Sequence, residues 1–368
     1  MARLIAALSG GVDSAVAAAR AVAAGHEVTG IHLALARNPG TLRQRDAAWP
    51  PGAPRRTVHG CCSLEDANDA RRVADVLGIP YYVWDFSAEF FEDVVQDFVS
   101  EYARGRTPNP CLRCNERIKF AAVIDRARRL GFDGVITGHY ARLETGADGV
   151  ALHRGRDQAK DQSYVLAVLT QAQLQHCWFP LGDAMKSEVR AEARGLGLTV
   201  ADKPESFDIC FIPEGDTAGY LEEKLGARPG NIVDGAGVVV GRHRGTFAYT
   251  IGQRKGLGLG RPTADGRPRY VVRVDPEAGL VVVGPREALR ITRLTATDPR
   301  WCEVAPDVLE GTVQLRAHAD EVPATVTVGE TSVTIDLHHP AYGIAPGQTA
   351  VMYDGTRVVG SATICTTG

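Results

Sequence analysis

The sequence has 368 residues, 44% of them hydrophobic and 23% charged, with a net charge of −3. This length exceeds one ordinary core, so we expect two or three globular domains. No stretch reaches the ~20 apolar residues that cross a bilayer, which argues against a membrane protein. Eight cysteines in so long a chain exclude a secreted disulfide scaffold. Because the N-terminus also lacks a signal-peptide cleavage pattern, we expect a cytoplasmic protein.

The first half of the chain alternates predicted strands and helices. Apolar runs predict strands at residues 3–8, 27–35, 80–86 and 134–140. Helical patterns cover residues 14–24, ended by a glycine, and 63–77, opened by a capping box. Strands separated by helices of this length predict a parallel sheet with right-handed crossovers. Residues 37–60 are rich in Pro, Arg and Gly without periodicity and predict an exposed, mobile insertion.

The pattern changes after about residue 220, where short Val, Thr and Ile runs alternate with Gly, Pro and Asp turns. Such runs predict antiparallel sheets or small barrels. They lie at residues 270–274, 280–283, 312–316, 324–328 and 332–337. Because a break near residues 285–291 divides this half, we predict three domains. They are an α/β domain over residues 1–215, a small β-rich domain over 216–288 and a barrel-like domain over 289–368.

A glycine-containing loop, Ser9-Gly-Gly-Val-Asp-Ser14, joins the first predicted strand to the first predicted helix. Glycines allow a positive φ and a close approach of ligand to backbone. Consecutive amides at a helix N-terminus then form an anion-binding nest. Gly10-Gly11 alone is typical of a turn, whereas the whole motif favours phosphate binding. It lacks the Gly-Lys-Ser/Thr of a Walker A loop and instead resembles the PP-loop of N-type ATP pyrophosphatases, which adenylate an oxygen and release pyrophosphate.

A second unusual segment, Thr107-Pro-Asn-Pro-Cys-Leu-Arg-Cys114, holds two cysteines. Its prolines rigidify the approach to Cys111 and Cys114. Neighbouring cations favour a thiolate, and they are Arg113, Arg117 and Lys119. A zinc site needs two further ligands, and only Cys61-Cys62 or distant single cysteines are available, in no usual spacing. We therefore predict no metal site in the protein. Cys210, alone in an apolar run, is by itself typical of a buried core cysteine.

Residues 241–273 carry eight Lys or Arg against one Asp, although the chain as a whole is slightly acidic. Such a cluster is able to steer a polyanion onto one face of a protein. A solvated, arginine-rich surface loop explains the same charges equally well. Charge alone therefore leaves both interpretations open.

Taken in order, five segments resemble the MnmA family of tRNA-specific 2-thiouridylases. They are Ser9–Ser14, Thr107–Asn115, Thr137-Gly-His-Tyr140, Lys160-Asp-Gln-Ser163 and Ser206-Phe-Asp-Ile-Cys-Phe211, and the resemblance continues through Ile251–Gly258 and Ala345–Gln348. It implies a PP-loop α/β domain followed by two β-rich domains. The implied activity is ATP-dependent thiolation of C2 of the wobble uridine 34 in tRNAs for Lys, Glu and Gln. ATP with Mg²⁺ is the implied cofactor, and a cysteine desulfurase or relay protein is the implied sulfur donor.

The same resemblance implies roles for individual residues. Cys114 is the nucleophile, Cys210 carries the persulfide, and the two form a transient disulfide. ATP is implied at Ala7, Leu8, Ser9, Gly10, Gly11, Val12, Asp13, Ser14, Leu33 and Gly138. The target base is implied at Asn109, Pro110 and Cys111, and tRNA at His139, Lys160, Asp161, Gln162, Arg316, Ala317 and Gln348. Without the resemblance, the sequence favours interpreting His139 as a strand-end histidine satisfied by hydrogen bonds. It likewise favours interpreting residues 160–162 as an exposed turn.

Two features depart from the family pattern. The insertion at residues 37–60 is longer than the family core requires. Cys111 stands where relatives can carry Asp, and a carboxylate forms no disulfide.

Two other functions remain as alternatives. A PP-loop ligase or synthetase for a small metabolite needs neither paired cysteines nor a basic β-rich half, and a non-catalytic RNA-binding protein would use its cysteines to hold zinc.

Overall fold

A computed structural model of the chain describes residues 1–35, 64–147, 149–204, 209–212, 215–259 and 266–367. The chain divides into two compact units, residues 1–95 with 111–215 and residues 96–110 with 216–368. The predicted insertion at residues 37–60 lies outside the described residues, as do Cys61, Cys62 and the first residue of the predicted capping box. No helix among the described residues is long and apolar enough to span a membrane.

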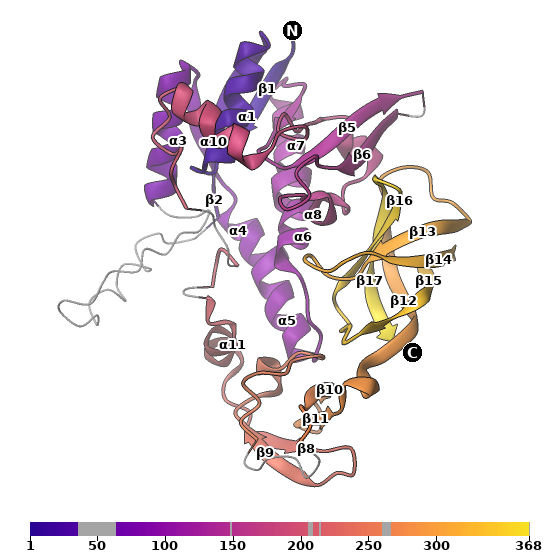
Figure 1. The fold of residues 1–368 in the computed structure, drawn as a ribbon. Helices are drawn as coiled ribbons and strands as arrows, with labels where there is room; N and C mark the ends of the chain where they lie inside the picture. The colour runs from indigo at the N-terminus through magenta and orange to yellow at the C-terminus, as the bar shows by residue number, and fades with distance from the viewer. Residues whose placement is uncertain (36–63, 148, 205–208, 213–214, 260–265, 368) are drawn as a thin grey trace, which may run out of the picture. The chain divides into compact units, whose positions relative to one another are not determined.

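The first unit contains a five-stranded parallel sheet in the order β3-β2-β1-β4-β7 (Figure 1). Its strands are β1 (Arg3–Ala7), β2 (Glu27–Ala34), β3 (Tyr81–Asp85), β4 (Gly134–Ile136) and β7 (Cys177–Trp178). This confirms the predicted parallel α/β fold. β4 is shorter than predicted, because residues 137–140 leave the sheet and form a loop. β7 has only two residues, too few to produce a periodic pattern in the sequence.

Small side chains let the helices approach this sheet closely. The long helices are α1 (Val12–Ala23), α3 (Leu64–Leu77) and α10 (Lys186–Gly195). α1 packs against both α3 and α10. The shared core contains Leu4 and Leu8 of the first strand and its connection, Val16 of α1, Ala70 of α3 and Val189 of α10. α1 buries alanines on several sides, so its N-terminus is held firmly at the carboxyl end of β1.

Short helical segments make up the middle of the chain. They are α4 (Ser87–Phe90), η2 (Phe91–Gln96), α5 (Asp97–Ala103), α6 (Pro110–Cys114), η3 (Asn115–Ala122), α7 (Val123–Arg129), α8 (Ser163–Leu166) and α9 (Gln171–Leu174). β5 (Ala141–Gly146) and β6 (Gly149–Arg154) pair as an antiparallel hairpin. η3 is a π-helix that begins directly after α6. Such segments occur frequently at functional sites.

The second unit begins its β-rich half with α11 (Thr217–Leu225) and a four-stranded sheet in the order β10-β11-β8-β9. The strands are β8 (Gly230–Val233), β9 (Val239–His243), β10 (Tyr270–Asp275) and β11 (Leu280–Gly284), with the 3₁₀ turn η5 (Thr246–Ala248) between the two hairpins. Both hairpins are antiparallel, but β8 and β11 pair in parallel. The prediction of an antiparallel sheet is therefore wrong for this pair, because the two hairpins meet through strands that are not consecutive.

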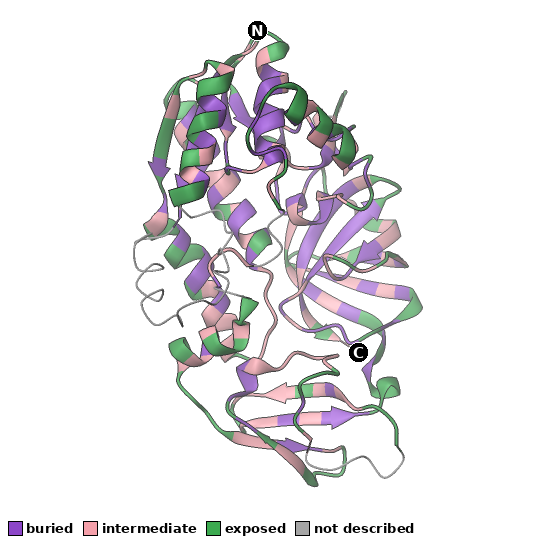
Figure 2. Cartoon of the chain, turned by 60° about the vertical axis from the view of Figure 1, so that its left-hand side comes forward, coloured by how far each residue is buried: buried purple, intermediate pink, exposed green. Residues whose placement is uncertain are grey.

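Six antiparallel strands of the second unit close into a barrel through the pairing of β12 with β17. A 3₁₀ turn, η6 (Arg286–Leu289), separates it from the preceding sheet at the predicted break. The strands are β12 (Arg290–Trp301), β13 (Val308–Gln314), β14 (Val322–Val328), β15 (Ser332–Tyr342), β16 (Thr349–Asp354) and β17 (Arg357–Thr367). Buried and less buried residues alternate along the barrel strands (Figure 2). In the first half of β15, Val333, Ile335 and Leu337 are the buried residues and belong to the barrel core. The barrel is confirmed, while the domain boundaries at residues 215 and 288 stay predictions.

Candidate active site

The two glycines of the loop between β1 and α1 have different backbone conformations. Gly10 has a φ of +78°, and a Cβ there would lie 2.4 Å from the carbonyl oxygen of Asp66. Gly11 has an extended backbone, with φ −103° and ψ 163°. Among the described residues, a Cβ on Gly11 would contact only the Ser9 hydroxyl, at 3.5 Å. The fold itself thus requires glycine at position 10, whereas the described part of the chain leaves space beside Gly11.

Ser14 fixes the conformation of this loop from the inside. Its hydroxyl donates to the Gly11 carbonyl at 3.0 Å and accepts from the Ser9 amide at 3.1 Å. Gly11 is the N-cap residue of α1, so no side chain caps the start of this helix. Because first-turn amides have no partner within a helix, they provide donors for an anion at this end of the sheet.

Asp13 of the loop is held by two residues that the sequence analysis did not identify. Lys186 Nζ lies 2.7 Å from both carboxylate oxygens, and the Tyr140 hydroxyl donates to Asp13 Oδ1 at 2.8 Å. Lys186 is the first residue of α10, and its amide donates to Asp157. A lysine at a helix N-terminus opposes the helix dipole, so its position there is a sequence signal of a specific anionic partner.

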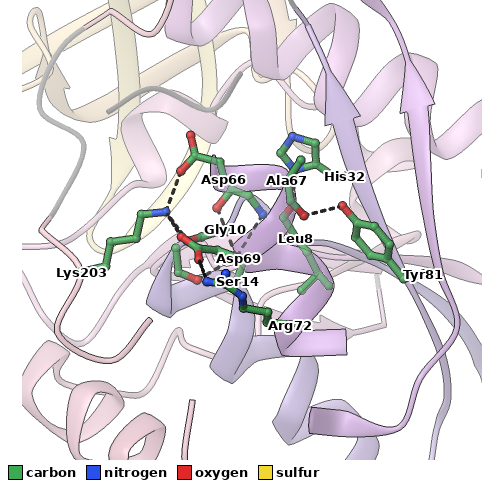
Figure 3. A network of polar contacts seen from close by, with 12 residues as sticks. Leu8, Gly10, Ser14, His32, Asp66, Ala67, Asp69, Arg72, Tyr81 and Lys203 are labelled. Atoms are coloured by element: carbon green, nitrogen blue, oxygen red, sulfur yellow. Dashed lines mark hydrogen bonds and ion pairs between the residues drawn. The ribbon is translucent and has the colours of Figure 1, made fainter. Parts of the chain in front are cut away.

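Lys203 joins the phosphate loop to α3 (Figure 3). Its ammonium donates to Asp66 at 2.7 Å, to Asp69 at 2.6 Å and to the Gly10 carbonyl at 3.0 Å. Burial acts to lower the pKa of Lys203, but hydrogen bonds and charge from the two aspartates outweigh it and raise the pKa. Lys203 therefore stays charged and ties Gly10 in place. The lysine is isolated in sequence from its partners, so no local motif revealed it.

Gly138 and Leu33, both implied in ATP binding, lie at the same end of the sheet. A Cβ on Gly138 would lie 2.5 Å from Asp13 C and from Ser14 N, so glycine is needed for the loop after β4 to pass α1. Leu33 is buried near the end of β2, opposite Trp84 of β3. The carboxyl edge of a parallel sheet is where such folds bind ligands.

The segment at residues 160–162 is not an exposed turn, so that interpretation is wrong. The Asp161 side chain is 9% exposed and accepts hydrogen bonds from Arg154, Gly155 and Ser163. Gln162 Oε1 accepts from the Tyr140 amide at 3.0 Å. These contacts hold the loop that carries Tyr140, the partner of Asp13.

His139 lies among aromatic rings at the end of that loop. Its ring is 5.7 Å from Phe120 and 6.0 Å from Phe179, centroid to centroid, and Nδ1 lies 2.7 Å from the Thr137 hydroxyl. Burial, together with the charge of Lys119, lowers its pKa from 6.5 to about 3. The imidazole is therefore neutral at neutral pH and offers stacking or a hydrogen bond rather than a charge.

The cysteine segment forms the short helix α6 and continues into η3. Cys111 is exposed, whereas Cys114 is 6% exposed. Asn115 is buried and donates from Nδ2 to the Val165 carbonyl at 2.9 Å. The cationic surroundings expected from sequence are partly neutralised, because Glu116 lies 2.8 Å from Arg113 and 3.8 Å from Arg117.

Cys210 lies in a different segment of the same unit and is partly exposed. The backbone turns there, with the Ile212 amide donating to the Ile209 carbonyl at 2.9 Å. The neighbouring Phe211 packs edge-on against Phe90 at 5.8 Å between ring centroids. A fully buried core cysteine is therefore not what the structure contains at this position. The preceding residues 205–208 lie outside the described residues.

The second unit contains the remaining residues implied in tRNA binding. Gly252 and Gly343 both have a positive φ, and their backbones lie against each other. A Cβ on Gly252 would lie 3.3 Å from Arg316 Nη2, and a Cβ on Gly343 would lie 3.2 Å from it. The carbonyls of Arg316 and Ala317 accept from Gln314. Gln348 Oε1 accepts from the Ala345 amide at 3.0 Å, so that side chain stabilises its own turn.

The basic segment at residues 241–273 is partly neutralised in the fold. Arg244 pairs with Glu222 at 2.5 Å, and Arg273 lies 3.8 Å from Asp275. Arg254 and Lys255 are exposed. Arg254 and Lys255 come directly after Gly252 and Gln253 in the chain, and Gly252 lies beside Arg316. Among the described residues no cluster of His, Cys, Asp and Glu is suited to hold a metal ion.

Comparison with known families agrees with this architecture. Residues 2–214 match the family described as the tRNA methyl transferase HUP domain, residues 218–285 its PRC-barrel domain, and residues 291–364 the aminomethyltransferase beta-barrel domain. The fold is thus a nucleotide-binding-type parallel sheet followed by two β-rich modules.

Individual relatives identify the family more closely. The chain is 62% identical to the tRNA-specific 2-thiouridylase MnmA of Nocardioides sp. (strain ATCC BAA-499 / JS614), covering 99% of this chain and 98% of that one. It is 59% identical to the MnmA of Acidothermus cellulolyticus, with the same coverage. The chain belongs to the MnmA family of tRNA-specific 2-thiouridylases. A 4-thiouridine synthetase–RNA complex aligns with 61% of this chain and 50% of its own, at 15% identity and a TM-score of 0.35, too low to carry an argument.

The two loop glycines should respond differently to substitution by alanine. Gly10→Ala places a side chain in the left-handed region against the Asp66 backbone, so we expect a loss of more than about 1–2 kcal/mol in unfolding free energy. Gly11→Ala keeps an allowed conformation and should change stability by no more than about 0.5 kcal/mol. Urea unfolding measures both. Equal destabilisation of the two variants would contradict the geometry of this loop.

The lowered pKa of His139 should be visible in solution. Its ring signals should not titrate between pH 8 and 5 in an NMR experiment. The unfolded chain binds a proton near pH 6.5 that the folded state refuses down to about pH 3, so acid destabilises the fold in this range. His139→Gln should reduce the rise of unfolding free energy with pH across that window. A titration midpoint near 6.5 for His139 would show that the ring is solvated.

Proposed function

We propose that this protein uses ATP to thiolate C2 of the wobble uridine in tRNA. The observation that carries the proposal is one chain holding both a glycine phosphate loop at a helix N-terminus and two separate cysteine segments, in a family of 2-thiouridylases. Methyl transfer, named in the descriptions of the first two matching domains, requires neither feature. A small-metabolite ligase would leave the cysteines and the β-rich half without a role.

ATP binding is proposed at the loop, with Ala7–Ser14, Leu33 and Gly138 as the contacting residues. The space that the described residues leave beside Gly11 and the uncapped start of α1 suit a phosphate. Lys186 and Lys203 are already paired with carboxylates. We therefore propose that Mg²⁺ accompanies ATP and compensates the phosphate charge, with Asp13 as the acidic side chain of the loop.

Adenylation makes the oxygen at C2 a good leaving group. The uracil oxygen attacks the α-phosphorus of ATP, a phosphorus–oxygen bond to the β-phosphate breaks, and pyrophosphate leaves. C2 is then bonded to AMP through oxygen and becomes electrophilic. The loop amides stabilise the charge that develops on the phosphate oxygens.

Sulfur is delivered by the cysteines. A donor protein, a cysteine desulfurase or a relay, places a persulfide on Cys210, which is partly exposed. The Cys114 thiolate attacks the Cys210 sulfur, releases hydrosulfide and forms a Cys114–Cys210 disulfide; hydrosulfide then attacks C2 and displaces AMP. Alternatively the persulfide attacks C2 directly and Cys114 resolves the intermediate. Both routes end in the same disulfide, which a reductant must cleave before the next turnover.

The target base is proposed to contact Asn109, Pro110 and Cys111, the residues at the start of α6. A wobble base reaches an enclosed site by leaving the stack of the anticodon loop. The neutral ring of His139 beside Phe120 and Phe179 suits stacking in such a site. Lys160, Asp161, Gln162, Arg316, Ala317 and Gln348 remain proposed tRNA positions. The structure favours backbone or indirect roles for Asp161 and Gln162, whose side chains hold their own loop.

The proposal predicts specific products and a specific pair of essential thiols. With tRNA, ATP, Mg²⁺ and a sulfide source, the enzyme should yield 2-thiouridine at the wobble position, AMP and pyrophosphate. Mass spectrometry of digested tRNA and a pyrophosphate assay measure these products. ADP and inorganic phosphate as the main products would refute the PP-loop chemistry.

In the same assay with a persulfide donor, Cys114→Ser and Cys210→Ser should each abolish thiolation, while Cys111→Ser retains much of it. Non-reducing peptide mapping after one turnover should recover a Cys114–Cys210 link. An inactive Cys111→Ser enzyme, or a Cys111–Cys114 link as the competent one, would reverse the assignment.

The exposed cations of the second unit should contribute to tRNA affinity. Replacing Arg254 and Lys255 together by Ala should weaken tRNA binding about tenfold at low salt and reduce the salt slope by about 1–2, without changing ATP binding. The matched control replaces Arg244 and Arg273, which removes the same charge from residues engaged by Glu222 and Asp275. An equal effect of the control would show that the Arg254 turn has no special role in tRNA binding, and a larger one would place the contact at Arg244 and Arg273 instead.

A further inference from the structure

The chain that leads into the cysteine segment is held on three sides within the second compact unit. The Thr107 amide donates to the Pro346 carbonyl at 2.8 Å. The Thr107 hydroxyl lies 3.5 Å from that of Thr250. Gly105 has a φ of +73°, and a Cβ there would lie 2.8 Å from Pro276. Three separate parts of the β-rich half thus contact the three consecutive residues 105–107.

Gly347 approaches the backbone of this segment directly. Its φ is +89°, and a Cβ on it would lie 2.9 Å from the Thr107 nitrogen and 3.0 Å from Arg106 Cβ. The turn that carries it is rigid, because the Gly347 amide donates to the Ile364 carbonyl of β17 at 2.8 Å and Gln348 closes the turn from the other side. No side chain fits at this position without moving the backbone of Thr107.

Thr250 holds the same segment through its hydroxyl. It hydrogen-bonds with the side chain of Tyr102 in α5, in addition to its approach to Thr107. Tyr102 stacks at a tilt on Phe98, with 4.9 Å between ring centroids, so α5 is fixed as well. The segment therefore has a fixed start in α5 and a fixed end at Thr107.

We propose that Gly347 and Thr250 are positioning residues for the sulfur-transfer reaction, acting through the segment at residues 105–107. This inference rests on the proposed function. Thr107 lies three residues before Pro110, where α6 begins, and α6 carries both Cys111 and Cys114. The two residues between Thr107 and Pro110 are Pro108 and Asn109, which precedes a proline. Both have a restricted backbone, so the position of Thr107 strongly constrains where α6 starts. The contacts within the second unit thereby fix the chain that leads up to Pro110, the first residue of α6.

The test compares two glycines with similar backbone strain. Gly347→Ala introduces a Cβ against Thr107. Gly355→Ala, at a φ of +57° and with no described residue within 4 Å of its Cβ, has only the conformational cost of a positive φ. We expect Gly347→Ala to lower kcat for tRNA thiolation about tenfold relative to Gly355→Ala, with KM for ATP within about twofold. Hydrogen exchange of the Thr107 amide should accelerate at least about tenfold in Gly347→Ala only.

A second pair keeps the inference testable if Gly347→Ala fails to fold. Thr250→Ser retains the hydroxyl and should keep near-normal kcat, while Thr250→Val removes it and should lower kcat several-fold. Equal kcat for the two glycine variants, or for the two Thr250 variants, would overturn the proposed role. If the unmodified enzyme makes no 2-thiouridine, the proposed function fails. The exchange rate of the Thr107 amide then still shows whether Gly347 holds this residue in place.

Discussion

The ammonium of Lys203 is the interaction on which the geometry of the phosphate loop depends. It has three protons and three acceptors, the Gly10 carbonyl and the carboxylates of Asp66 and Asp69. An ammonium at this depth requires such complete pairing, because an unpaired buried charge costs several kcal/mol. Lys203 Nζ thus ties the loop at Gly10 and the first turns of α3, at Asp66 and Asp69, to the chain segment after α10 that carries the lysine.

A second chain of contacts holds the other side of the loop. Gln162 fixes the Tyr140 amide, the Tyr140 hydroxyl fixes Asp13, and Lys186 neutralises that carboxylate. Gly138 lets the loop after β4 lie directly against the α1 backbone. The residues between positions 137 and 163 therefore act first on the shape of the phosphate site. Two hydrogen bonds, from the Tyr140 amide to Gln162 and from the Tyr140 hydroxyl to Asp13, connect this segment to the loop.

Sequence patterns predicted the parallel sheet, the barrel and the phosphate loop, because those depend on local periodicity and on glycine chemistry. They failed where a partner is distant in sequence. Lys203 and Lys186 meet their aspartates across more than a hundred residues, and no spacing rule links them. The same holds for Asp161, which resembles an exposed turn residue until its contacts with Arg154 and Ser163 are known. The short strand β7 and the parallel β8–β11 pair were missed because tertiary packing, not propensity, decides them.

The boundary between the two compact units falls between Pro110 and Cys111, inside helix α6. The loop at residues 9–14 and both Cys114 and Cys210 belong to the first unit, whereas Thr107 is held by the Pro346 carbonyl and Thr250 within the second. The first residue of α6 thus belongs to one unit and its other four residues belong to the other. The contacts of Thr107 hold the chain before the helix, and the hydrogen bond from Asn115 to the Val165 carbonyl holds the residue that follows it.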